Sequence, residues 1–252
     1  MNPLDESAYM PYRSDVRIGR GRALVLAPHP DDEVLGCAGA IMRHVEDGDP
    51  VQVHVLTDGA LGAPAGTANV IEVREAESRA AAAVLGYGEP VFWRWPDREL
   101  SRMHELPDRL AEVIREFRPD WIYAPSWWEI HPDHVVLSWV ATTVLGREGL
   151  AARLVLYEVG MPQHPNLLLD ISDYLDRKKQ AMHCFASQLA QQAYDSHILA
   201  LNRYRTYTLP APVLAAEAYR VVRSNELPAD PANPRIARLW CQDLSASSLK
   251  LG

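Results

Sequence analysis

Short apolar runs of the kind that form strands alternate with helical segments along most of this chain. ALVLAP at 23–28, VQVHVLT at 51–57 and DWIYAP at 120–125 predict buried strands. Segments between them predict helices, for example 71–85, which is rich in alanine and stops at Gly86. Strands that alternate with helices form βαβ units, so we expect an α/β fold. It should be a Rossmann-like domain of three layers, with a mostly parallel sheet and helices on both faces. Further strands are expected at 90–95, 153–159, 167–172 and 216–223, and further helices at 36–46, 106–117, 132–146 and 172–185.

The pattern favours one domain with an extension at each end. A chain of 252 residues can bury a large core, and single α/β domains of this size are common. Residues 1–20 are polar and irregular, which predicts an N-terminal arm. The domain is expected to span 21–224. Residues 225–252 contain several prolines and are expected to form a C-terminal extension packed on the same domain.

Composition and charge argue against several classes of function. The net charge is −8 and no cluster of Lys and Arg stands out, so we expect neither a nucleic-acid-binding surface nor binding to an anionic membrane. The chain has neither a signal-peptide pattern nor an apolar run of about 18 residues, so we expect no membrane insertion and a cytoplasmic location. Cys37, Cys184 and Cys241 lack the spacing of a thiolate metal site or a disulfide framework. A small-molecule partner is favoured, and both a monomer and a homo-oligomer stay open.

Two clusters of imidazole and carboxylate follow predicted strands. APHPDDEVLG at 27–36 places His29, Asp31 and Asp32 directly after the first strand, and a second cluster, HPDH, lies at 131–134 after the strand DWIYAP. Because right-handed crossovers bring the carboxyl ends of parallel strands to one edge of the sheet, both clusters should face the same crevice.

The residue types in these clusters are those of a catalytic zinc site. Zinc in such a site takes three protein ligands from His and Asp or Glu, and two His and one Asp from the clusters would supply them. A metal ion would also explain the adjacent carboxylates of Asp31 and Asp32, because it neutralises one while the other stays free as a base. Helix capping by Asp, with Pro at the first helical position, could explain either cluster alone. The two clusters together favour a metal site.

With these motifs the sequence resembles the PIG-L/LmbE family of zinc-dependent N-acetylglucosamine deacetylases. The likeness rests on Pro28-His29-Pro30-Asp31-Asp32-Glu33 with Gly36, and on His131-Pro132-Asp133-His134. Weaker pieces are Thr57-Asp58-Gly59, Arg74 with Glu77, Pro96-Asp97, Ser187-Gln188, Tyr204-Arg205 and Glu217-Ala218-Tyr219. The resemblance covers about 22–223.

The resemblance implies a role for each matching residue. Zinc would be held by His29, Asp32 and His134. Asp31 would be the general base that deprotonates a zinc-bound water and then passes the proton to the leaving amine. His131, oriented by Asp133, would stabilise the developing oxyanion by charge or by a hydrogen bond.

Substrate contacts are less strongly indicated. Arg74 and Asp97 match positions that contact sugar hydroxyls in the family, although they could equally be a surface charge on a helix and a turn aspartate. Trp127 and Trp128 precede the second motif, where an aromatic face could stack on a sugar ring. Trp128 is our candidate for this contact, and core packing is at least as well supported for one of the two side chains. Many family members have an acidic residue where this chain has Ala60, so contacts made from that loop should differ.

We therefore predict a zinc-dependent hydrolase that removes an N-acetyl or other N-acyl group from a glucosamine-containing substrate. One alternative is a metal-dependent amidase that acts on a thiol conjugate or another N-acyl compound. An alternative of another class is a non-catalytic module that binds a sugar or nucleotide, although no G-x-G-x-x-G follows the first strand. The aglycone and the length of the acyl chain are not predicted, because the loops at 59–69, 97–105 and 160–166 would select them.

Overall fold

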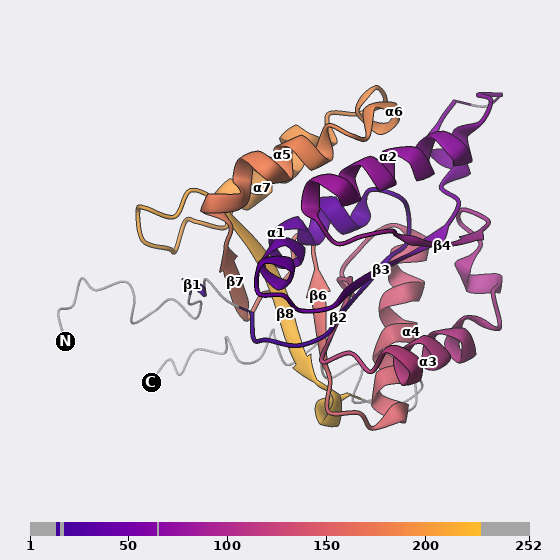
Figure 1. The fold of residues 1–252 in the computed structure, drawn as a ribbon, viewed down its shortest axis with the longest axis horizontal. Helices are drawn as coiled ribbons and strands as arrows, with labels where there is room; N and C mark the ends of the chain where they lie inside the picture. The colour runs from indigo at the N-terminus through magenta and orange to yellow at the C-terminus, as the bar shows by residue number, and fades with distance from the viewer. Residues whose placement is uncertain (1–13, 16–17, 65, 228–252) are drawn as a thin grey trace, which may run out of the picture.

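The structure, a computed structural model, describes residues 14–15, 18–64 and 66–227, which form one mixed sheet covered by helices (Figure 1). The strands are β1 (Ser14–Asp15), β2 (Ala23–Ala27), β3 (Val51–Thr57), β4 (Val91–Trp95), β5 (Trp121–Pro125), β6 (Arg153–Tyr157), β7 (Leu167–Asp170) and β8 (Ala216–Arg223). The α-helices are α1 (Asp32–Glu46), α2 (Val70–Leu85), α3 (Leu106–Phe117), α4 (Pro132–Glu148), α5 (Leu175–Met182), α6 (Ala186–Leu189) and α7 (Tyr194–Tyr204). Short 3-10 turns are η2 (Ala60–Gly62), η3 (Leu100–Arg102), η4 (Ser172–Tyr174) and η5 (Ser224–Glu226).

The sheet is mostly parallel, as predicted. Its strand order is β1-β7-β8-β6-β5-β2-β3-β4. Only β8 runs against its neighbours, β6 and β7; the other pairs in the described part of the chain are parallel. The carboxyl ends of β2, β3, β4, β5 and β6 therefore meet at one edge of the sheet.

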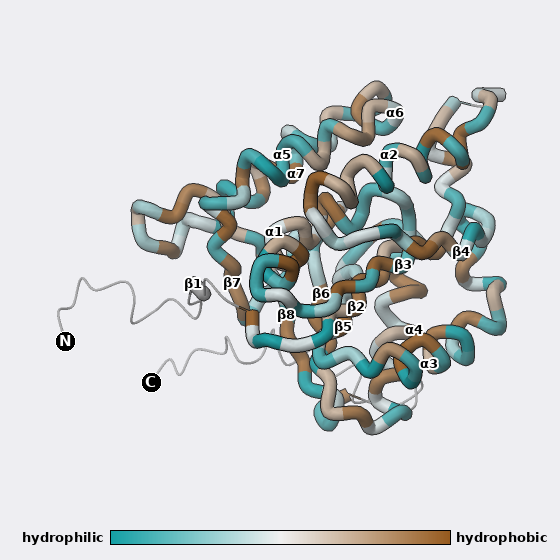
Figure 2. Tube along the Cα trace, in the orientation of Figure 1, coloured by the Kyte–Doolittle hydropathy of each residue, from teal (hydrophilic) through white to brown (hydrophobic). Residues whose placement is uncertain are grey.

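Side-chain alternation in β2 divides the core into two layers. Ala23, Val25 and Ala27 pack in the layer covered by α1, α2 and α5, whereas Leu24 and Leu26 pack in the layer covered by α3 and α4. Full burial of each leucine stabilises the fold by about 1.5–3 kcal/mol. Figure 1 shows the two groups of helices on opposite sides of the sheet, and Figure 2 shows hydrophobic residues gathered along the central strands. The predicted three layers are confirmed.

Most predicted elements are present, with differences at their ends. Helix α1 begins at Asp32, four residues before the predicted start at Gly36. The predicted helix at 172–185 is a 3-10 turn followed by the shorter α5. Helix α7 was not predicted, because only Ile198 and Asn202 are buried in it and its apolar pattern is weak. The expected arm at 1–20 and extension at 225–252 lie largely outside the described residues, and no helix among the described residues is long and apolar enough to span a bilayer.

A buried ion pair is inserted into a kink of α1. Cys37 has non-helical angles of φ −144° and ψ 25°. In a regular helix the N–H of Gly39 would donate to the carbonyl of Leu35. Here the Gly39 N–H donates to the Glu217 carboxylate at 2.9 Å, and the Leu35 carbonyl accepts from Lys178 Nζ at 2.9 Å. Lys178 Nζ lies 2.7 Å from Glu217 Oε1. The ion pair therefore supplies both the donor and the acceptor that the kink leaves without helical partners.

Candidate active site

The strand order reverses between β2 and β5, and a cavity lies at this point. The chain leaves β2 toward α1 on one face of the sheet and leaves β5 toward α4 on the other face, which opens a crevice between the two loops. The cavity has a volume of about 600 Å³ and is lined by both motifs. Its lining includes seven of the predicted site residues: His29, Asp31, Asp32, Arg74, Asp97, His131 and His134.

The loop after β2 holds Asp31 in a strained backbone conformation. Asp31 has φ 129°, which is rare for a residue other than glycine. It occupies the N-cap position of α1, yet its side chain makes no capping hydrogen bond. Its N–H donates to Glu33 Oε2 at 3.0 Å, and Glu33 Oε1 accepts from the Ser78 hydroxyl at 2.7 Å. Capping therefore does not account for Asp31, and Glu33 orients the loop.

Arg74 fixes the side chain of Asp31 from the opposite wall. Arg74 is only 3% exposed; its Nη2 donates to Asp31 Oδ2 at 3.0 Å and to the Pro30 carbonyl at 2.6 Å. Its Nη1 donates to the carbonyl of Gly59 at 2.8 Å. A Cβ atom at Gly59 or Gly62 would lie 2.4 or 2.5 Å from Arg74 Nη1, so both glycines are needed for this approach. Arg74, which was expected to contact the sugar, is therefore hydrogen-bonded to Asp31, the predicted base.

The two adjacent carboxylates have opposite electrostatic environments. Burial raises the pKa of Asp31 to about 7, although Arg74 acts in the other direction. Burial would also raise the pKa of Asp32, but the neighbouring imidazoles of His134 and His29 outweigh it and lower that pKa below its usual value. Such a divergence is typical of a pair of acids with separate roles.

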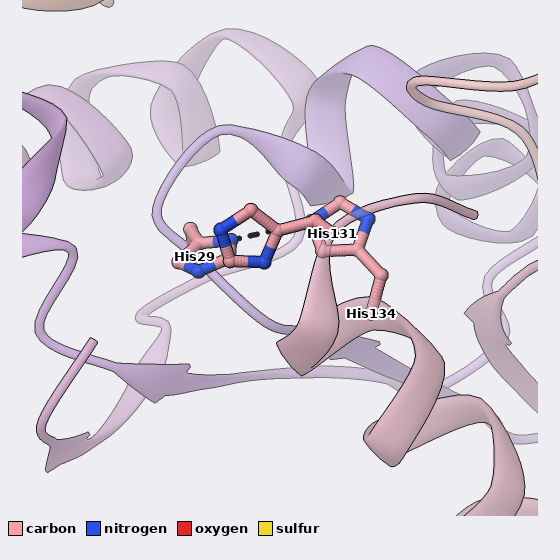
Figure 3. Close-up of side chains that lie close together, drawn as sticks. All are labelled: His29, His131 and His134. Carbon is pink, nitrogen blue, oxygen red and sulfur yellow. Dashed lines mark hydrogen bonds between the residues drawn. The ribbon is translucent and has the colours of Figure 1, made fainter. Parts of the chain in front are cut away.

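Three potential ligand atoms converge beside Asp31. Asp32 Oδ2 lies 3.1 Å from His29 Nδ1 and 3.1 Å from His134 Nε2, and the two nitrogens lie 3.3 Å apart. Figure 3 shows His29 from the loop after β2 facing His131 and His134 from the start of α4, and its dashed line joins His29 to His134. The expected ligands are brought together in a group that could hold a metal ion.

Carboxylates on the far side of each imidazole orient the two rings. His29 Nε2 lies 3.3 Å from Asp97 Oδ1 and 3.3 Å from Asp133 Oδ2, and His134 Nδ1 lies 3.4 Å from Glu129 Oε2. A proton on His29 Nε2 and one on His134 Nδ1 leave a lone pair on the other nitrogen of each ring. Those nitrogens, His29 Nδ1 and His134 Nε2, face Asp32. Burial alone would lower the pKa of both imidazoles, but the carboxylates raise it, to about 9 for His134.

Asp133 contacts His131 through its backbone N–H and not through its carboxylate. That carboxylate accepts the backbone N–H of Arg98 at 2.7 Å and of Leu100 at 3.2 Å, in addition to facing His29. The backbone N–H of Asp133 instead donates to His131 Nδ1 at 3.3 Å, so the neutral ring carries its proton on Nε2. Burial and the adjacent imidazoles lower the pKa of His131, which favours this neutral form.

The structure also changes the list of residues around the site. Trp128 is not part of the cavity wall, and its neighbour Ile130 is; Trp127 is buried in the core, as the alternative held. Asp133 lies behind His29 rather than in the wall. Glu129 was missed, because its burial two residues before His131 is seen only in the structure. Other unpredicted lining residues are Leu35, Leu61–Pro64, Arg98, Ile130, Val159, Gly160, Gln188, Gln191 and Tyr194.

Comparisons with known proteins place this site in a family. A family model for PIG-L, described as GlcNAc-PI de-N-acetylase, matches 24–145. The diacetylchitobiose deacetylase of Thermococcus kodakarensis is 29% identical over 69% of this chain and 72% of its own. The 1D-myo-inositol 2-acetamido-2-deoxy-alpha-D-glucopyranoside deacetylase of Mycobacterium sp. (strain KMS) is 27% identical over 89% of each chain. The solved structure of conserved protein TT1542 from Thermus thermophilus has a TM-score of 0.70 and 31% identity, over 79% of this chain and 93% of that one.

Similarity extends to a protein with another named activity. The 4-oxalmesaconate hydratase of Pseudomonas putida is 28% identical over 66% of this chain and 73% of its own. Similarity alone thus does not fix the reaction, which has to be argued from the site. The domain match over 24–145, with 31% identity across 93% of the Thermus protein, establishes that the chain belongs to the PIG-L family.

Proposed function

We propose that this chain is a zinc-dependent hydrolase that removes the N-acetyl group from a glucosamine-containing substrate. The observation that carries the proposal is the convergence of three ligand atoms within 3.1–3.3 Å of one another, next to the carboxylate of Asp31, which Arg74 holds outside this group. The curated relatives named as deacetylases of acetylated amino sugars support the same reaction.

The residues present fit a zinc ion. Ligands about 2.0–2.1 Å from a tetrahedral metal are about 3.3–3.4 Å from one another, close to the separations of the three atoms here. His29, Asp32 and His134 would hold the ion. Two other groups also bring potential ligand atoms together, one of His29 with His131 and His134, the other of His29 with Asp97 and Asp133. In the second group both carboxylates face His29 Nε2, where they suit a hydrogen bond better than a shared metal. When bound, zinc would polarise the amide carbonyl and lower the pKa of a water molecule.

Asp31 is the proposed general base. Its carboxylate is outside the ligand group, lines the cavity and is held by Arg74. In this position it would accept a proton from the attacking water and return it to the leaving nitrogen, which balances the hydrolysis without a further proton carrier. Arg74 positions the base, and because the residue also lines the cavity it is the first proposed contact to a sugar hydroxyl.

His131 is the proposed donor to the carbonyl oxygen. Its Nδ1 is occupied by the N–H of Asp133, so the proton on Nε2 is free to form a hydrogen bond. Such a bond strengthens as the oxygen gains negative charge, and it therefore stabilises the transition state more than the bound substrate. Asp97, in the cavity wall beside His29, is the proposed second contact to a sugar hydroxyl.

The test is release of a primary amine and of acetate from methyl N-acetylglucosaminide by the zinc-loaded full chain. The Asp31→Asn variant should keep its zinc and lose about 100-fold or more in kcat, because a positioned base contributes about that much. Asn tolerates a positive φ, so the loop should be retained. Asp108→Asn, at a carboxylate whose side chain is 83% exposed on α3, is the matched control. Full activity of Asp31→Asn would show that Asp31 is not the base.

Metal analysis separates the remaining alternatives. His134→Ala should lower the zinc content of the purified protein, and unchanged occupancy would refute that ligand. A protein with neither zinc nor acetate release would be a binding module. Amine release from thiol conjugates but not from the sugar would indicate the amidase alternative.

A further inference from the structure

Three exposed apolar side chains surround the polar floor of the cavity. Leu61 is 54% exposed, Ile130 is 73% exposed and Tyr194 is 40% exposed, and all three line the cavity. They come from three separate segments: η2 after β3, the loop after β5 and the first residue of α7. We call these three residues the apolar rim. Single exposed apolar residues are ordinary on a protein surface, whereas their convergence on one cavity indicates a binding surface.

The backbone holds the rim in place. The Leu61 N–H donates to Asp97 Oδ2 at 3.1 Å, which ties η2 to a residue beside His29. Ile130 follows Glu129, whose carboxylate accepts backbone N–H groups at 2.8–3.4 Å from the loop after β6. Two of the three rim residues are therefore fixed by the same acids that surround the imidazoles.

We propose that the apolar rim binds an alkyl or aryl group carried by the amino sugar, so that the preferred substrate is amphipathic. This inference rests on the proposed deacetylation, because the floor would hold the sugar and its amide while the rim holds the group beyond them. An unsubstituted sugar would leave the rim in water. An apolar substituent would cover it and be transferred out of water at the same time, which favours binding in proportion to the area buried.

The apolar group could be the aglycone or a longer N-acyl chain, and the two sources are distinguishable. Arg98 also lines the cavity, so an anionic aglycone is the competing recognition chemistry. Four probes cover these cases: the methyl, octyl and phosphate-bearing glycosides of N-acetylglucosamine, and methyl glucosaminide with an N-octanoyl group. All are used below the concentration at which the alkyl compounds form micelles.

The experiment compares kcat/KM for the four probes in the wild-type chain and in the Leu61→Ser/Ile130→Ser double variant. We expect one of the octyl compounds to exceed the methyl N-acetyl compound by about tenfold, and the double variant to bring this ratio close to one. Val91→Ser, at an exposed valine of β4 that is not part of the cavity lining, should leave the ratio unchanged. A preference for the octyl glycoside identifies the aglycone as the source, and a preference for the N-octanoyl compound identifies the acyl chain.

Two results would overturn the inference. Equal kcat/KM for methyl and both octyl compounds would refute the rim while leaving the deacetylase function intact, and so would a preference for the anionic glycoside alone. If no probe releases an amine, the deacetylase function fails. Binding of the same probes to the zinc-loaded Asp31→Asn variant then decides the rim by itself, and equal Kd values for methyl and octyl compounds would refute it.

Discussion

The Lys178–Glu217 ion pair allows a prediction that does not depend on the metal. Lys178 and Glu217 have side chains 0% and 1% exposed, and the ammonium also donates to the Leu35 carbonyl at 2.9 Å. The Lys178→Met substitution keeps a long unbranched side chain and removes only the charge and the donor. The Glu217 carboxylate then remains buried in the kink of α1 without a counter-ion.

The expected loss of stability follows from what remains around Glu217. Its carboxylate would keep three neutral donors, the N–H groups of Gly39 and Ala40 and the hydroxyl of Tyr219, at 2.9, 3.1 and 2.5 Å. These donors reduce the cost but do not neutralise the charge. Removal of one partner of a buried ion pair costs about 3–5 kcal/mol. In a protein of this size, that loss corresponds to a decrease in Tm of about 6–20 °C.

Urea unfolding of the metal-free full chain measures this loss. Lys179→Met is the matched control, because the neighbouring lysine has a side chain 40% exposed and its ion-pair partner among the described residues is the exposed Asp176. Its free energy of unfolding should change by less than about 0.5 kcal/mol. The Lys178→Met/Glu217→Gln double variant should recover part of the loss, since it leaves no unpaired charge. A Lys178→Met protein within about 1 kcal/mol of wild type would refute the reasoning.

Three further predictions concern metal binding, the arginine beside the base and stability in acid. The pKa of His29 is raised and that of His134 is raised to about 9, so protons compete with zinc for both imidazoles. Zinc affinity should therefore increase from about pH 6 to about pH 9. A constant zinc affinity measured by calorimetry over this range would contradict the prediction. Gly62→Ala should displace Arg74, because the new Cβ atom would lie 2.5 Å from Arg74 Nη1. The variant should have a lower kcat and an unchanged zinc content. A wild-type kcat would count against a role for Arg74 in positioning Asp31. Burial lowers the pKa of His54 to about 4, so the folded state favours the neutral ring. About 3 kcal/mol of stability present above pH 6.5 should be lost as the pH falls to about 4, and His54→Gln should lose less over this range in urea unfolding at several pH values.

The sequence was sufficient to predict that the two motifs share one cavity, because only local signals were required. A strand that ends at Ala27 and one that ends at Pro125 were both recognisable from short apolar runs. Parallel order then requires the residues after them to share an edge, and the same rule applies to Asp97 after β4. Residues separated by about a hundred positions were therefore associated correctly without any knowledge of side-chain packing.

What the sequence did not predict depends on contacts or on side-chain direction. Glu129 is oriented by N–H groups of the loop after β6, a contact that no local pattern indicates. The choice between Trp128 and Ile130 as a wall residue depends on the path of an irregular loop, for which no periodicity exists. The resemblance implied that Asp133 orients His131, and it did not indicate that the contact comes from the backbone N–H of Asp133 while the helix start turns the carboxylate toward Arg98 and Leu100.

The adjacent acids Asp31 and Asp32 illustrate why the strained residue is useful. In a regular helix start both carboxylates would lie near the same N–H groups and repel each other. The φ of 129° at Asp31 separates them, so Asp32 faces the imidazoles while Asp31 faces Arg74. Such a conformation costs about 1–3 kcal/mol, and the hydrogen bonds from the Asp31 N–H to Glu33 and from Arg74 to its carboxylate are of a size to offset it. Glu33 and Arg74 therefore contribute to the site by maintaining the separation of the two carboxylates, which the proposed division between metal ligand and base requires.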